Sequence, residues 1–193
     1  AVLIFTSGIN IFFLLSFSLF VLSFLIYLII YVPRFDYIQN RILSFFDRDT
    51  GTHNFQSEKA IESITSGGFF GKGIGEGVLK NRVPEAHTDY IISVISEEFG
   101  VVAIILILLL FLIFIYMVFK KINYEKSEKI KLVLIGCASL ILMQATIHVG
   151  VNIRLFPTTG MTLPFLSYGG SSIVSISILS GIILNLTKRK INY

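Results

Sequence analysis

A carboxylate suited to acting on a substrate is Asp89, in the segment of residues 84–90, PEAHTDY. Proline near a first turn is typical of a helix start, and Thr88 or Asp89 can cap that helix. Capping is therefore one explanation of Asp89. The other is catalysis, because a carboxylate at the mouth of a membrane bundle can meet the head group of a lipid-linked substrate while its surroundings exclude much of the water.

Glycines are concentrated in residues 67–77, GGFFGKGIGEG. A nucleotide-binding loop is rejected, because no strand pattern precedes the run. A phosphate-binding P-loop also needs Ser or Thr after its lysine, whereas Lys72 is followed by Gly73. Two interpretations stay open: a flexible turn at a membrane surface, or a loop whose bare backbone approaches a ligand closely.

Three polar side chains, Gln144, His148 and Asn152, recur at every fourth position of an apolar stretch. On a helix they form one stripe, and polar groups at membrane depth face the bundle interior or a wet cavity. Hydrogen bonding between helices is favoured for Gln144. His148 lies near the outer end, where it can line a substrate cavity.

Two prolines and several glycines interrupt the chain over residues 154–172, RLFPTTGMTLPFLSYGGSS. Such a segment at a membrane boundary is predicted to be a re-entrant or broken-helix element, buried in protein or lining a cavity. Its lone cation, Arg154, either anchors the chain to lipid head groups or contacts a pyrophosphate.

The amino-acid composition indicates the class of protein that carries these residues. Of 193 residues, 54% are hydrophobic and only 15% are charged, against roughly 25% charged in soluble proteins. This excludes an ordinary soluble domain and a disordered chain. The single cysteine excludes an internal disulfide. The net charge of +4 comes from short basic clusters beside apolar runs, which indicates a membrane protein and no nucleic-acid partner.

Four uncharged or nearly uncharged stretches are long enough to cross a bilayer: residues 9–32, 100–119, 132–151 and 169–186. The predicted fold class is an all-α, polytopic integral membrane helical bundle. One basic cluster follows the second span and another follows the fourth. Because positively charged loops stay in the cytoplasm, we predict that both clusters, and with them the C-terminus, are cytoplasmic. Their members are Lys120, Lys121, Lys126, Lys129, Lys131, Lys188, Arg189 and Lys190.

The long segment 33–93 is then an extracytoplasmic loop. Ten of the twelve acidic residues lie between Asp36 and Glu98. A connection of this length is normally functional or disordered, and its recurring apolar residues argue against disorder. We predict short helices within it, one over residues 56–65 and another over 85–98 that runs into the second span.

Two long segments carry a family resemblance. Residues 66–100, SGGFFGKGIGEGVLKNRVPEAHTDYIISVISEEFG, and residues 152–172, NIRLFPTTGMTLPFLSYGGSS, resemble the large outer loop and the last signature of the SEDS family (shape, elongation, division and sporulation). The second segment is closer to the division member than to the elongation member. The resemblance covers only the C-terminal part of a ten-span fold, so we expect five or six further spans before Ala1 and no activity from this chain alone.

The resemblance implies a peptidoglycan glycosyltransferase that polymerises lipid II, with Asp89 as the general base and as a ligand for Mg²⁺ or Mn²⁺, and with no organic cofactor. A neutral sugar hydroxyl is a poor nucleophile, and general-base assistance is worth roughly 10²–10⁴-fold. The leaving pyrophosphate needs positive charge. Candidate substrate-binding residues are Lys72, Lys80, Arg82, Glu85, His87, Thr88, His148, Arg154 and Ser167.

The resemblance also implies partners and a location. Expected partners are lipid II, a class B penicillin-binding transpeptidase and other division proteins, in the bacterial inner membrane. Two other functions remain open, a lipid II flippase and a non-catalytic scaffold for division. A flippase needs a polar pathway across the membrane, whereas the polar residues here concentrate near one side.

Overall fold

The computed structural model describes residues 10–46, 52–77 and 85–188, and within these ranges every regular element is helical. This confirms the predicted all-α fold class. The chain divides into two compact units, Ala1–Asn54 and Phe55–Tyr193.

The first unit contains α2 (Ile11–Tyr31), a 3-10 turn (Pro33–Phe35) and α3 (Asp36–Phe46). Asn10 caps α2 by accepting the N–H of Phe12 at 3.1 Å. The helix ends at Tyr31 because Pro33 forces the preceding residue, Val32, into an extended conformation. No residue of α2 is buried, so its apolar side chains are available to lipid or to other protein.

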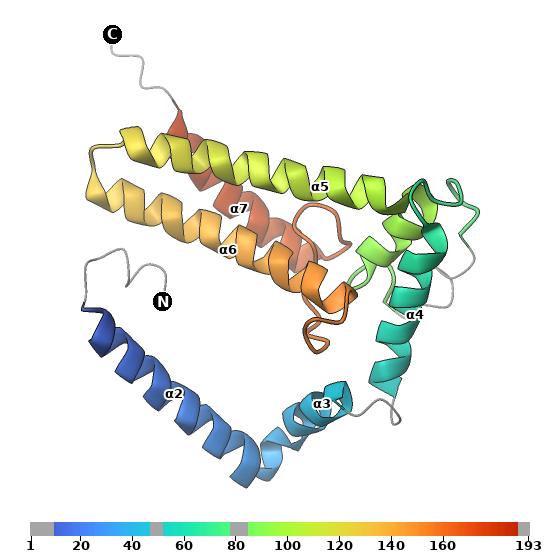
Figure 1. The fold of residues 1–193 in the computed structure, drawn as a ribbon. Coiled ribbons are helices and arrows are strands. Elements are labelled where there is room, and N and C mark those ends of the chain that lie inside the picture. The colour runs from blue at the N-terminus through green and yellow to red at the C-terminus, as the bar shows by residue number, and fades with distance from the viewer. Residues whose placement is uncertain (1–9, 47–51, 78–84, 189–193) are drawn as a thin grey trace. The chain divides into compact units, whose positions relative to one another are not determined.

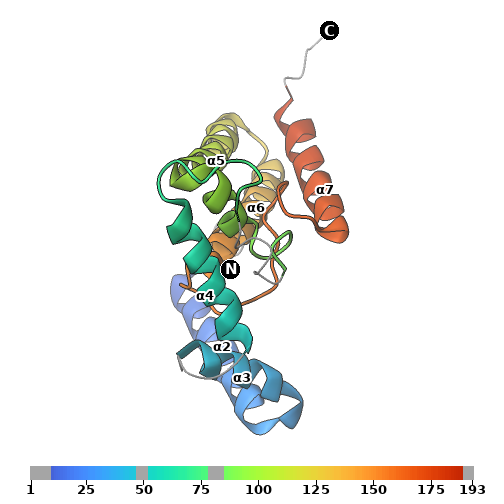
Figure 2. The same cartoon turned by 90° about the vertical axis from the view of Figure 1, so that its right-hand side faces the viewer.

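The second unit holds α4 (Thr52–Gly67, of which residues 55–67 belong here), α5 (Ile91–Tyr124), α6 (Glu128–Asn152) and α7 (Gly170–Thr187) (Figure 1). α6 packs against both α5 and α7 and lies between them (Figure 2). Their shared core is apolar and consists of Val118, Ile122, Leu134, Cys137, Ala138, Ile141, Ile176 and Ile183. A second, smaller cluster of Ala60, Ala86, Tyr90 and Val151 joins α4 to one end of this bundle.

Four helices, α2, α5, α6 and α7, are long and apolar enough to cross a membrane. Each overlaps one of the four predicted spans. α5 extends over 34 residues, but Gly100 has φ 80° and ψ 178°, which interrupts the helix with a kink. The predicted helix over residues 56–65 lies inside α4.

The helix predicted over residues 85–98 begins later than expected. Residues 85–90 form turns, and α5 starts at Ile91 with Tyr90 at its N-cap. Glu85 has φ 56°, which a helix does not accommodate. The N-cap position belongs to Tyr90, whose side chain makes no cap hydrogen bond, so neither Thr88 nor Asp89 occupies the N-cap that the sequence predicted for them.

The glycine segment, residues 67–77, packs directly on the kink of α5. The N–H groups of Lys72 and Gly73 donate to the carbonyls of Glu97 and Glu98, and Val101 N–H donates to Gly68. A Cβ on Gly71 would lie 2.2 Å from Glu98 O, and one on Gly100 would lie 2.1 Å from Phe69 O. Glycine is required at both because two backbones touch, a packing role that neither interpretation from the sequence included.

Candidate functional site

Asp89 lies in a compact turn, residues 85–90, which we call the Asp89 turn. The N–H groups of Thr88, Asp89 and Tyr90 all bond to the carbonyl of Glu85. The hydroxyl of Thr88 also donates to the Glu85 carboxylate at 2.9 Å. Glu85 and Thr88 therefore shape the turn from within.

Three successive carbonyls of the Asp89 turn are each held by a different residue. His87 O accepts from the N–H of Tyr168 at 2.9 Å. Thr88 O accepts from the Ser167 hydroxyl at 2.7 Å, and Asp89 O accepts from the Asn152 amide at 2.9 Å. The backbone that carries Asp89 is thus fixed from outside by the end of α6 and by residues 153–169, which we call the proline loop.

The polar stripe of α6 is what secures this arrangement. Gln144 donates to Thr162 O at 2.9 Å and to the Ser172 hydroxyl at 3.1 Å, as predicted for a residue that bonds between elements. His148 Nδ1 is 2.7 Å from Met161 O. Asn152 holds Asp89. The stripe therefore positions the proline loop and the Asp89 turn against each other.

His148 and Ser167 have no free surface for a substrate in this structure. His148 is fully buried and Ser167 is 3% exposed. The Ser167 hydroxyl is engaged with both Thr88 O and Leu163 N–H. Both were expected to contact substrate, and the structure places them beneath the surface as residues that position the loop.

Asp89 is half-buried, and its carboxylate lies beside the proline loop. A Cβ built on Gly160 would lie 3.6 Å from Asp89 Oδ2, in ordinary contact. Gly160 also lines a hollow of about 460 Å³ between α6 and α7. A second hollow, of about 360 Å³, is lined by His87 of the same turn together with Ile91, Leu166 and Tyr168. Asp89 is therefore carried by a rigid turn that adjoins open space.

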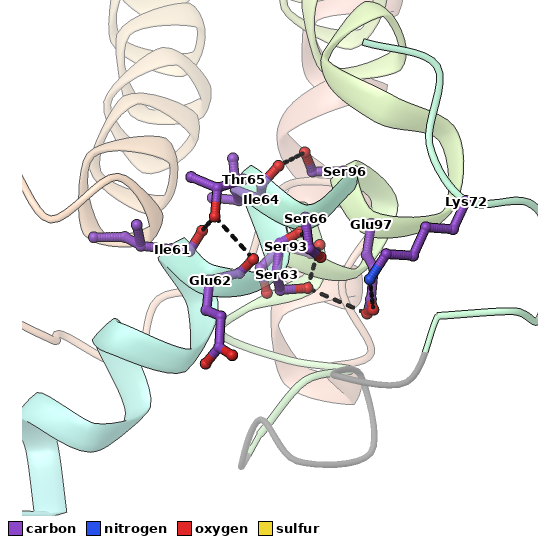
Figure 3. A network of polar contacts seen from close by, with 10 residues as sticks. All are labelled: Ile61, Glu62, Ser63, Ile64, Thr65, Ser66, Lys72, Ser93, Ser96 and Glu97. Carbon is purple, nitrogen blue, oxygen red and sulfur yellow. Dashed lines mark hydrogen bonds and ion pairs between the residues drawn. The ribbon is translucent and has the colours of Figure 1, made fainter. Parts of the chain in front are cut away.

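The cation Lys72 meets a fully buried carboxylate, Glu97, with Nζ 3.4 Å from Oε1 (Figure 3). The hydroxyl of Ser63, on α4, donates to the other oxygen of Glu97 at 3.3 Å and to Ser93 O at 3.1 Å. This network joins α4, the glycine segment and α5. Sequence reasoning missed Glu97 because its burial depends on the close approach of the glycine segment.

Arg154 also has a carboxylate partner, since Nη1 lies 3.6 Å from Glu58 Oε1 on α4. Its Nη2 is buried and has no hydrogen-bond partner among the described residues. Arg154 has φ 60°, so it ends α6 in the left-handed conformation. The remaining predicted cations, Lys80 and Arg82, lie outside the described residues.

A metal ion is not caged by protein side chains in the part of the chain that the structure describes. There, no group of three His, Cys, Asp or Glu side chains can hold one. Mg²⁺ is commonly bound by one or two carboxylates together with substrate phosphates. Asp89 therefore suits a metal site in which the protein provides one carboxylate and the substrate phosphates provide the other ligands.

Known proteins match this chain over most of its length. A family model described as "Cell cycle protein", covering FtsW, RodA and SpoVE, matches residues 1–192. A probable peptidoglycan glycosyltransferase FtsW of Caulobacter vibrioides is 38% identical over 81% of this chain and 40% of its own length. One of Trichlorobacter lovleyi is 34% identical over 96% of this chain and 49% of its own.

Among solved structures, a chain described under "Structural coordination of polymerization and crosslinking by a peptidoglycan synthase complex" matches with a TM-score of 0.75 and 26% identity. The match covers 96% of this chain and 52% of that one. The chain spans about half the length, or less, of the curated relatives that it matches. The family model matches nearly the whole chain, including both motif segments, and the structure has four helices that are long and apolar enough to cross a membrane. The chain therefore belongs to the FtsW/RodA/SpoVE family of multi-pass membrane proteins.

Proposed function

We propose that this chain is the catalytic part of a peptidoglycan glycosyltransferase that polymerises lipid II during cell division. Its relatives are named as probable peptidoglycan glycosyltransferases. The observation that carries the proposal is the external fixing of three carbonyls at His87, Thr88 and Asp89. A catalytic group benefits from such preorganisation, because small misplacements cost rate.

In the proposed reaction, the 4-hydroxyl of one sugar attacks the anomeric carbon of another. A glycosidic bond forms as the bond to undecaprenyl pyrophosphate breaks. Asp89 accepts the proton of the attacking hydroxyl, and the pyrophosphate leaves with the bonding electrons. General-base help of this kind is worth about 10²–10⁴-fold. Asp89 would hold a Mg²⁺ or Mn²⁺ ion, which would supply positive charge for the leaving group.

Positive side chains supply the remaining charge for the pyrophosphate. Arg154 is the cation of the proline loop; its Nη2 has no partner among the described residues, and Glu58 contacts its Nη1 at 3.6 Å. Lys72 is held by the buried Glu97 and so is less available. Lys80 and Arg82 remain candidates from the sequence.

We further propose that the protein lies in the bacterial inner membrane with the C-terminus in the cytoplasm. The basic residues between α5 and α6 and after α7 support this orientation. A class B penicillin-binding transpeptidase is the proposed partner, since the structurally similar chain is described as part of a complex that coordinates polymerisation and crosslinking.

The test is glycan synthesis from lipid II by the full-length protein, with Asp89→Asn and Asp89→Ala variants. We expect each to lower the polymerisation rate by about 100-fold or more. Glu62→Gln is the matched control, because Glu62 is a surface carboxylate on α4 that pairs with Lys59. Undiminished polymer from the Asp89 variants would remove Asp89 from the mechanism, and lipid II flipping without polymerisation would favour a transporter.

A further inference from the structure

At the end of the bundle where α5 passes into α6 lies a polar hollow of about 520 Å³, lined by Lys121, Tyr124, Glu125, Ile130, Asn185, Leu186 and Lys188. The C-terminal end of α7 reaches the same end of the bundle (Figure 1). Asp89 and the proline loop lie at the other ends of these helices. The hollow is therefore separate from the proposed catalytic site.

Two lysines with no ion-pair partner among the described residues converge on this hollow. Lys121 is half-buried in the last turn of α5, and Lys188 is the exposed C-cap residue of α7. The nearby Lys131 differs, because it pairs with Glu128 at 2.9 Å. The positive charge of Lys121 and Lys188 is thus available to a ligand.

The one carboxylate in the lining, that of Glu125, accepts hydrogen bonds from backbone N–H groups. Its Oε1 accepts the N–H groups of Lys126 at 3.0 Å and of Ser127 at 3.2 Å, which closes the turn between α5 and α6. Among the described residues, Glu125 forms no ion pair with either lysine. Asn185 and Tyr124 add neutral polar groups that can donate hydrogen bonds to a phosphate.

The hollow also has an apolar side, formed by Ile130 and Leu186. It lies at the end of three helices that are long and apolar enough to span a bilayer. A free inorganic phosphate would use only the lysines. A phospholipid would use both sides, with its phosphate on the lysines and its glycerol and first methylenes against the apolar residues.

We propose that this hollow binds the head group of an anionic phospholipid, with the phosphate between Lys121 and Lys188. Basic pockets between membrane helices are known to take such head groups. The occupant is a single phospholipid taken from the surrounding bilayer and held at this site, and it is not the substrate of the proposed reaction. The site fixes the ends of α5 and α7 to one lipid and so to one depth in the membrane.

The position of both lysines at helix C-termini has another explanation, compensation of the helix dipole. The two accounts differ in what they predict for bound lipid. Dipole compensation affects helix stability alone, whereas a head-group site makes the retention of anionic lipid depend on these two side chains.

The test is native mass spectrometry of the full-length protein, purified in mild detergent and supplied with phosphatidylglycerol or phosphatidylcholine. The variant Lys121→Gln/Lys188→Gln is compared with Lys126→Gln/Lys129→Gln, which removes the same charge from exposed residues of the same region. We expect the first variant to retain at least tenfold less phosphatidylglycerol, since each lysine near an anionic lipid contributes roughly fivefold. The second is expected to retain it.

Equal loss in the two variants, or no loss in either, overturns the proposal. A preserved thermal unfolding temperature shows that the first variant is folded, and Lys121→Arg/Lys188→Arg should restore lipid retention. Competition by inorganic phosphate at concentrations similar to those of the lipid would identify a free-anion site and contradict the lipid assignment. Polymerisation of lipid II is not the readout, so this test can fail while the proposed glycosyltransferase activity stands.

Discussion

The hydroxyl of Ser167 donates a hydrogen bond to the carbonyl of Thr88 at 2.7 Å, across 79 positions of sequence. The same oxygen accepts the N–H of Leu163 at 2.8 Å. One buried hydroxyl therefore closes the proline loop on itself and attaches it to the residue before Asp89. The Asp89 turn and the proline loop form one structural unit.

Ser167→Ala should impair positioning more than substrate binding. The change leaves Thr88 O and Leu163 N–H without their partner, at a cost of about 1–3 kcal/mol in stability. In the full-length protein we expect kcat for lipid II polymerisation to fall roughly tenfold or more, because misplacement of a catalytic group costs rate, with KM nearly unchanged. Ser180→Ala is the control, since Ser180 bonds only within α7, to Ile176 O. A rise in KM alone would show that Ser167 contacts substrate.

Breaking the Lys72–Glu97 pair from its exposed side should destabilise the protein. Lys72→Met leaves the Glu97 carboxylate fully buried without its cation, and we expect a loss of about 1–3 kcal/mol, discounted because Lys72 is 37% exposed. Lys72→Met/Glu97→Gln should be more stable than Lys72→Met alone. Lys59→Met, which breaks an exposed pair with Glu62, should cost less than about 1 kcal/mol. Thermal unfolding in detergent measures these three variants together with Glu97→Gln alone, and additive effects of the Lys72 and Glu97 changes would contradict the coupling.

Gly100→Ala should prevent correct folding. The new Cβ would lie 2.1 Å from Phe69 O, in a residue that already has φ 80°. We expect a strong loss of folded yield and of the unfolding temperature. Gly181→Ala is the matched change, because no atom lies within 4 Å of its Cβ position, and it should be neutral or stabilising by about 0.5–1 kcal/mol. Normal yield from Gly100→Ala would show that the kink is not fixed as described.

Arg154→Ala distinguishes a substrate contact from a structural ion pair. If Arg154 binds pyrophosphate, its removal should lower polymerisation about tenfold or more, whereas Glu58→Ala should have a smaller effect. Arg154→Lys retains the charge and should keep part of the activity. Polymerisation rates and unfolding temperatures are measured together. Equal losses from Arg154→Ala and Glu58→Ala would assign Arg154 to the ion pair alone.

Periodicity predicted the helices well because they are long and apolar. The same spacing rule placed Gln144, His148 and Asn152 on one face, and all three do bond inward. Their individual partners could not be predicted, because these depend on the path of the proline loop through Met161 and Thr162.

Local propensity failed where distant backbone groups decide the conformation. The segment before Ile91 reads as a helix start, yet its carbonyls are taken by Asn152, Ser167 and Tyr168. The buried position of Glu97 was missed for the same reason. A sequence shows that a glutamate precedes Gly100, but not that the glycine segment will cover it.

The kink at Gly100 affects how deep Asp89 lies relative to the bilayer. At 1.5 Å per residue, the part of α5 that follows Gly100 is about 36 Å long, which already crosses a hydrocarbon layer of about 30 Å. The nine residues before Gly100, Ile91 to Phe99, form a separate short helical segment that is not needed to cross the bilayer. A bilayer can therefore be spanned without drawing Asp89 among the acyl chains, where a charged group would cost several kcal/mol.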